Sequence, residues 1–212
     1  MIYVILISII MIISVVAIGM INAITGATNF IFKLPRIYIL LSLLVLISGP
    51  IMAVLIYVQN FKLSFVPDAL RVNTISYSKE ESWGLGPGGN EAGIRIYPLP
   101  EEIAEIIKTR GMEFFKNLPE NKNQRKRKWR GRYGVWHETP ISENRYWKRN
   151  NGDILDIYDY ICRYGFCIQI DKSVLDQAAE IINTKGNYYA YGRIGLIVVS
   201  PTKKVVIYMY NG

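Results

Sequence analysis

Two long apolar runs occupy most of the first 60 residues and constrain what the chain can fold into. They cover residues 2 to about 24 and 37 to about 58, and the two charged side chains of this region, Lys33 and Arg36, lie in the gap between them. Each run can cross about 30 Å of hydrocarbon as a helix that rises about 1.5 Å per residue. Residues 1–60 are therefore predicted to form a transmembrane helical hairpin that sits in a lipid bilayer.

The alternative for the first run is a cleaved signal peptide, which carries basic residues before a shorter apolar core. No Lys or Arg precedes this run. Lys and Arg near the span ends set orientation, so Lys33 and Arg36 place the gap in the cytoplasm. We therefore predict an inner (cytoplasmic) membrane protein whose C-terminal domain is periplasmic or extracellular.

The two cysteines of the chain, Cys162 and Cys167, lie close together in the stretch ICRYGFC. In an oxidising compartment such a pair is expected to form a small-loop disulfide. The alternative is two ordinary buried thiols in a cytosolic core. The disulfide is the favoured interpretation, and it agrees with an external domain.

Residues 61–212 are enough for one further domain with its own core. Alternating apolar and β-branched residues predict strands at 70–78, 93–99, 166–170, 188–199 and 203–210. Capping and periodicity predict helices at 100–108, 112–117, 153–163 and 172–184. The predicted fold is a two-helix transmembrane hairpin followed by a single α+β domain with a mainly antiparallel sheet.

A glycine-rich stretch, GLGPGGN at residues 84–90, superficially resembles a phosphate-binding loop. It lacks the Lys of a Walker loop, and a strand rather than a helix is expected after it, which excludes a Rossmann fingerprint. The favoured interpretation is a turn between strands that needs glycine for positive φ. A recognition loop is the alternative, with Gly86, Gly88, Gly89 and Asn90 as candidate binding residues.

The sequence offers few candidate catalytic residues. His137 is the only histidine, and with Glu138 it is a weak candidate for acid–base work. Three aspartates at positions 153, 156 and 159 share one side of a predicted helix, where a solvated face or a helix cap is expected more often than a cation site. The sequence predicts no metal and no cofactor.

Most of the net charge of +8 comes from the stretch NKNQRKRKWRGR at residues 121–132, which holds seven basic residues and no acid. This run is a solvated loop, a contact for anionic lipid headgroups, or a contact for an acidic protein partner. Nucleic acid is not expected, since it would require a cytoplasmic domain. Interleaved aromatic residues suit a protein interface or a membrane interface, and the alternative is that they cover the core of a small domain. The candidate binding residues here are Arg125, Lys126, Arg127, Lys128, Trp129, Arg130, Arg132 and Trp136.

Together these features predict a membrane-anchored binding protein that captures or neutralises another protein at the inner membrane. Its general layout is that of an immunity or inhibitor protein, by architectural analogy alone. One alternative is a cytoplasmic-facing effector in which a ligand-sensing domain gates the helices. Another is an envelope hydrolase that uses His137.

Overall fold

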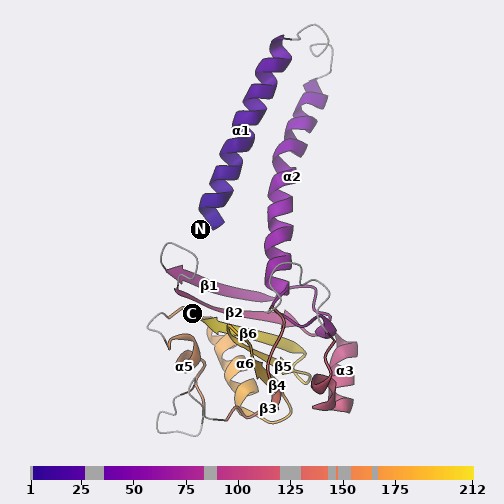
Figure 1. The fold of residues 1–212 in the computed structure, drawn as a ribbon, viewed down its shortest axis with the longest axis vertical. Helices are drawn as coiled ribbons and strands as arrows, with labels where there is room; N and C mark the ends of the chain where they lie inside the picture. Colours follow the sequence, from indigo (N-terminus) through magenta and orange to yellow (C-terminus); the bar gives the residue numbers. More distant parts are fainter. Residues whose placement is uncertain are drawn as a thin grey trace. The chain divides into compact units, whose positions relative to one another are not determined.

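The computed structural model describes residues 2–26, 36–83, 90–119, 130–142, 147, 154–163 and 167–212 (Figure 1). The chain divides into two units, Met1–Val58 and Gln59–Gly212. The first unit holds the apolar helices. The second holds the sheet and also the end of the second apolar helix.

Both apolar runs are helical: α1 spans Ile2–Gly26 and α2 spans Arg36–Leu63. A backbone without water must satisfy its own polar groups, and an apolar run of this length does so as a helix. The helix α2 continues through Pro50. Its stretch Leu40–Leu63 is long and apolar enough to span a membrane, whereas the described apolar part of α1, Ile7–Met20, is too short to qualify. Among the described residues one spanning helix is supported, so the two-helix transmembrane hairpin is not confirmed.

The second unit is built on one six-stranded sheet in the order β1-β2-β6-β5-β4-β3, and every neighbouring pair is antiparallel. This sheet, together with helices, confirms the predicted α+β class with an antiparallel sheet. The strands are β1 (Tyr77–Trp83), β2 (Asn90–Pro98), β3 (His137–Glu138), β4 (Tyr188–Tyr191), β5 (Leu196–Ser200) and β6 (Val205–Asn211).

Each face of the sheet is covered by its own hydrophobic cluster, and β6 shows how alternation divides them. Ile207 and Met209 pack with residues of α5 (Ile157–Ile161) and α6 (Lys172–Asn183). Val206, Tyr208 and Tyr210 pack in the other cluster, with α3 (Glu101–Arg110), α4 (Glu113–Lys116) and the residues that follow α2. Successive side chains of a strand point to opposite faces, so a strand buried on both faces is apolar throughout.

Several local predictions are confirmed closely. The helix α3 follows Pro100 and ends at Gly111, whose φ is +55°. The helix α6 lies where it was expected, after Asp171. The hairpin between β5 and β6 pairs Ser200 with Val205 across the predicted turn. Proline before the first turn, glycine after the last turn and short polar turns are the strongest local signals in a sequence.

Other local predictions are wrong. Most of the strand expected at 70–78 is irregular, because the chain turns through a short 3-10 helix, η2 (Asp68–Leu70), and Arg71 adopts a left-handed φ of +51°. No strand covers residues 167–170. The strand expected at 188–199 is two strands, β4 and β5, which turn at Gly192–Gly195. Gly195 permits this turn, since its φ is +99° and a Cβ would lie 2.5 Å from the Met209 carbonyl oxygen.

Candidate functional site

A cluster of charged side chains joins the end of α2 to strands β1, β2 and β6. Lys62 Nζ lies 2.8 Å from Glu80 Oε1, and Arg95 Nη2 lies 2.6 Å from Glu80 Oε2. Arg95 Nη2 also donates to the Tyr210 hydroxyl at 3.0 Å, and that hydroxyl donates to Glu80 Oε2 at 3.0 Å. One carboxylate therefore holds two cations and a phenol that come from separate parts of the chain.

Burial differs across this cluster, with the Arg95 side chain 4% exposed and the Glu80 side chain 35% exposed. Burial raises the pKa of Glu80, but the hydrogen bonds and charges of Lys62 and Arg95 outweigh it and lower the pKa to about 2. Burial also opposes the charge on Arg95, yet Tyr210, Tyr97 and Glu80 hold its pKa above its ordinary value. Both groups are charged at neutral pH, so the cluster is a fixed ion pair and a poor acid–base site.

Aromatic rings surround the rest of the Arg95 guanidinium. Its central carbon lies 4.9 Å from the ring centroid of Tyr210, 5.1 Å from that of Phe65 and 5.9 Å from that of Tyr208. Its Nε and Nη1 atoms have no hydrogen-bond acceptor among the described residues. The ring faces supply the remaining attraction, because a planar and weakly hydrated guanidinium stacks well on aromatic groups.

Tyrosine hydroxyls hold the backbone at the end of α2. The Tyr97 hydroxyl donates to the Lys62 carbonyl oxygen at 2.9 Å, and the Tyr133 hydroxyl donates to the Phe65 carbonyl oxygen at 2.6 Å. Burial raises the pKa of Tyr97 to about 12, so this hydroxyl stays protonated and able to donate. The Phe65 ring stacks on Tyr208 at 5.0 Å between centroids. The end of the apolar helix is thus attached to the sheet at several points.

Residues 130–138, here called the edge segment, run beside β4 at the edge of the sheet. Tyr133 forms an isolated antiparallel bridge with Gly192, and the Gly134 amide donates to the Tyr191 carbonyl oxygen at 2.9 Å. The two residues of β3 continue this pairing, with His137 opposite Tyr189. The long basic and aromatic stretch therefore ends as an extra ribbon on the sheet.

Side chains of the edge segment divide between packing and exposure. The guanidinium carbon of Arg130 lies 4.2 Å from the ring centroid of Phe61 near the end of α2. The Trp136 ring stacks on Phe115 at 4.4 Å. Arg132 is exposed, and Val135 is 75% exposed. The segment thus presents an arginine and an aliphatic side chain next to well-packed aromatic rings.

The structure brings three of the predicted binding residues, Arg130, Arg132 and Trp136, together on the edge segment. Asn90 begins β2, opposite Trp83 of β1. The strand expected after the glycine-rich stretch is present as β2, which pairs directly with β1. The other predicted binding residues lie outside the described residues: Gly86, Gly88, Gly89, Arg125, Lys126, Arg127, Lys128 and Trp129.

The weak catalytic candidates His137 and Glu138 form the short edge strand β3, and both are exposed. The His137 ring lies 5.5 Å from the Tyr189 ring, measured between centroids. Glu138 Oε1 accepts a hydrogen bond from the Gly186 amide at 3.2 Å, so this carboxylate holds the turn after α6. Neither contact brings a nucleophile to the pair.

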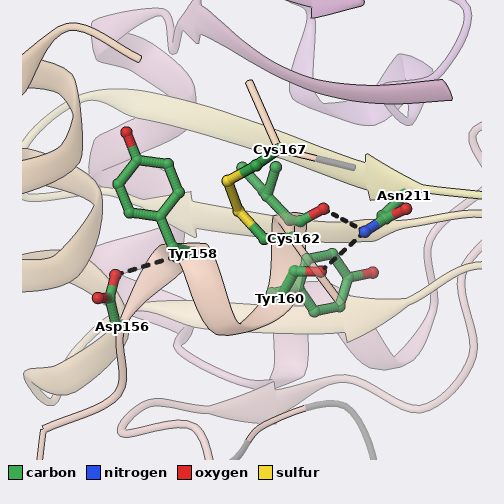
Figure 2. Close-up of a disulfide and its surroundings, with 7 residues drawn as sticks. Asp156, Tyr158, Tyr160, Cys162, Cys167 and Asn211 are labelled. Atoms are coloured by element: carbon green, nitrogen blue, oxygen red, sulfur yellow. Dashed lines mark hydrogen bonds between the residues drawn. A yellow bond between two sulfur atoms is a disulfide. The ribbon is translucent and has the colours of Figure 1, made fainter. Parts of the chain in front are cut away.

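Cys162 and Cys167 form the predicted disulfide, with their Cα atoms 4.5 Å apart (Figure 2). Asp156 caps the neighbouring helix α5, since its Oδ1 accepts from the Tyr158 amide at 2.9 Å. Asp153 lies outside the described residues. No group of three His, Cys, Asp or Glu side chains suited to a metal ion occurs within the described parts of the chain. The aspartate next to the disulfide thus has a structural task.

The sequence interpretation missed the cluster formed by Lys62, Glu80 and Arg95. A signal was present in β2, where Arg95 lies between Ile94 and Ile96 in a strand that is covered on both faces. A charged residue in such a strand needs a partner, because an unpaired buried charge is costly. That partner could not be named without the order of the strands.

Comparison with known protein families, curated proteins and solved structures finds no match to this chain. No relative therefore supplies a function by similarity.

Proposed function

We propose that this chain is a membrane-anchored binding protein that captures or neutralises another protein at the inner membrane. The apolar stretch Leu40–Leu63 of α2 supports the anchor. The disulfide between Cys162 and Cys167 supports a periplasmic or extracellular domain, because disulfides persist in oxidising compartments. Within this class we favour an immunity or inhibitor protein, on architecture alone.

The observation that carries this proposal is the composition of the exposed edge segment. Outside α1 and α2, three large apolar side chains are exposed among the described residues: Val135 at 75%, Ile154 at 74% and Ile194 at 38%. Val135 belongs to the edge segment, and Ile194 belongs to the β4–β5 turn whose Gly192 pairs with that segment. The edge segment combines arginine, aromatic and exposed aliphatic residues, which is the composition that protein interfaces favour.

The electrostatics support binding over catalysis. Glu80 and Arg95 neutralise each other in a fixed pair, and the Glu138 carboxylate holds the Gly186 amide. A general base needs an ionisable group that is within reach of a substrate and titrates near the working pH. The described residues bring together no such group with a nucleophile.

A second candidate is the sensor–effector, and one observation favours it. The charged cluster and the tyrosine hydrogen bonds connect the end of α2 directly to three strands of the sheet. A ligand that displaced β1 would act on Lys62 through Glu80. This candidate predicts that Glu80→Gln changes how ligand binding to the sheet gates the membrane helices. Capture of a partner by the edge segment does not require the contact between Glu80 and Lys62.

The test is site-directed photocrosslinking in membranes of cells that produce the full chain. A photoreactive phenylalanine analogue replaces Val135 in one variant and Ile154 in a matched control, since these two aliphatic side chains are almost equally exposed. We expect a discrete protein adduct from position 135 and none from position 154. Adducts at both positions, or at neither, would contradict capture by the edge segment.

A further inference from the structure

Three arginines gather beside the residues that end the apolar helix. Phe61 lies in the apolar stretch Leu40–Leu63, and the Arg130 guanidinium carbon is 4.2 Å from its ring centroid and 5.5 Å from that of Phe65. Arg132 and Arg193 line a shallow cleft to which Phe65 also contributes. Arg130 is therefore in direct contact with the last turn of the helix, and Arg132 and Arg193 line a cleft with a residue just after it.

The cleft is formed between the edge segment and the β4–β5 turn. Eight residues line it, and they include Arg132 and Arg193 but no acid. Both arginines are exposed, and Phe65 and Tyr133 also contribute to the lining. The cleft encloses almost no volume, so a ligand there would contact side chains at the surface and would not enter a cavity.

Chain connectivity sets the depth of the cleft in a membrane. Phe65 follows Leu63, the last residue of the apolar stretch, by two positions. Two residues reach at most about 8 Å, because neighbouring Cα atoms are about 3.8 Å apart. The headgroup layer on each side of the hydrocarbon is about 5–8 Å thick. Phe65 is therefore within reach of the headgroup layer if α2 spans the bilayer.

We propose that Arg132 and Arg193, with Arg130 beside them, bind the phosphate group of an anionic phospholipid. A guanidinium is planar and donates two parallel hydrogen bonds to phosphate oxygens. Inorganic phosphate shares this chemistry, but the position next to the helix end favours the lipid. The site needs the membrane anchor of the proposed function and does not need the protein partner.

The test uses the full chain in detergent micelles, with bound lipids detected by native mass spectrometry. Phosphatidylglycerol and phosphatidylcholine are titrated in parallel into the wild type, Arg132→Gln/Arg193→Gln and Lys172→Gln/Lys203→Gln. The lysine pair is a matched control, because it removes the same charge from residues paired with acids of α6. A fourth variant, Arg132→Lys/Arg193→Lys, keeps the charge.

We expect the wild type to prefer phosphatidylglycerol and the Gln variant of the arginines to bind it roughly 30-fold more weakly, which is about 2 kcal/mol at 1.4 kcal/mol per factor of ten. The lysine control should stay within about twofold of the wild type, since distant charges are screened. The Lys variant should retain most of the binding. Should the Gln variant fail to fold, the wild-type preference and its loss at high salt still decide the question.

Equal affinity for both lipids in the wild type would overturn the proposal, and so would an equal loss in the lysine control. A third arm adds inorganic phosphate at constant ionic strength. If only a high concentration of phosphate displaces phosphatidylglycerol, the result supports the lipid as the ligand of the arginines. Tight binding of phosphate without a preference between the two lipids would overturn the proposal that the ligand is a lipid. The two proposals fail separately, because the absence of a protein adduct from position 135 would contradict partner capture and leave the lipid preference of the wild type unchanged.

Discussion

Replacing Glu80 by Gln removes the one negative charge that joins Lys62 to Arg95. Gln has nearly the same shape as Glu, so the change tests charge with little effect on packing. The Arg95 side chain is 4% exposed and would lose its ionic partner at 2.6 Å. The Tyr210 hydroxyl would remain beside it at 3.0 Å. We therefore expect Glu80→Gln to destabilise the second unit without changing its fold.

Two estimates bracket the size of this effect. The fall in the pKa of Glu80 from 4.5 to about 2 corresponds to about 3 kcal/mol before solvent screening. Because Glu80 is 35% exposed, screening reduces this figure to about 1–2 kcal/mol. Breaking a fully buried ion pair costs about 3–5 kcal/mol, which is an upper bound for this half-buried one. We expect a loss of about 2 kcal/mol, or roughly 4–8 °C in Tm for a unit of this size.

The lowered pKa of Glu80 also predicts how its contribution to stability changes with pH. A carboxyl whose pKa is lower in the folded state stabilises that state above its unfolded pKa and loses this contribution as pH falls. For Glu80 the contribution should be complete above about pH 4.5 and should disappear as pH falls through about 2. The difference in stability between wild type and Glu80→Gln should therefore be constant near neutral pH and shrink below pH 4.5.

The assay is thermal unfolding of the full chain in detergent, followed by tryptophan fluorescence. All four tryptophans lie after residue 80, so the signal reports on the second unit. Glu102→Gln is the matched control, because its ion pair with Arg71 at 3.2 Å is exposed and should contribute less than about 1 kcal/mol. Equal effects of Glu80→Gln and Glu102→Gln, or a Glu80→Gln effect unchanged down to pH 2, would refute the reasoning.

Three further predictions concern core packing, the disulfide and His137. Gly93→Ala should lower the free energy of unfolding by about 1–3 kcal/mol in a denaturant titration, since its Cβ would lie 2.5 Å from the facing tyrosine ring of β6. Gly134→Ala is the control and should be nearly neutral, because the nearest atom to its Cβ would be 3.5 Å away. Replacing Cys162 and Cys167 by Ser should cost about 2 kcal/mol, because the disulfide closes a short loop, and reduction of the wild type should lower its denaturation midpoint equally. His137→Ala should change the free energy of unfolding by less than about 0.5 kcal/mol in the same titration, because both residues of β3 are exposed.

Local signals in the sequence predicted much of the second unit. Pro100 and Gly111 mark the ends of α3 closely, and the cysteine spacing led directly to the disulfide. The strand predicted at 70–78 failed because alternation was read through a turn, where Asp68 starts η2 and Arg71 takes positive φ. Propensity alone does not separate an extended loop from a strand, since pairing decides between them.

The candidate site was predicted only in part. Arg130, Arg132 and Trp136 were chosen for their residue types, and the structure places them on one ribbon beside β4. Which of them face solvent did not follow from composition, because the Trp136 ring lies on Phe115 and Arg130 lies on Phe61. Side-chain exposure depends on neighbours that come from distant parts of the chain.

The sequence alone determined three features: the apolar character of the first 60 residues, the antiparallel hairpins and the disulfide. Each of them depends on residues within a few positions of one another. Only the tertiary structure decided that Lys62, Glu80, Arg95 and Tyr210 meet. Their contact requires the strand order β1-β2-β6 and the register that places Arg95 opposite Tyr208. Alternation tells which face a side chain takes, but the partner on that face is set by long-range pairing that no local pattern encodes.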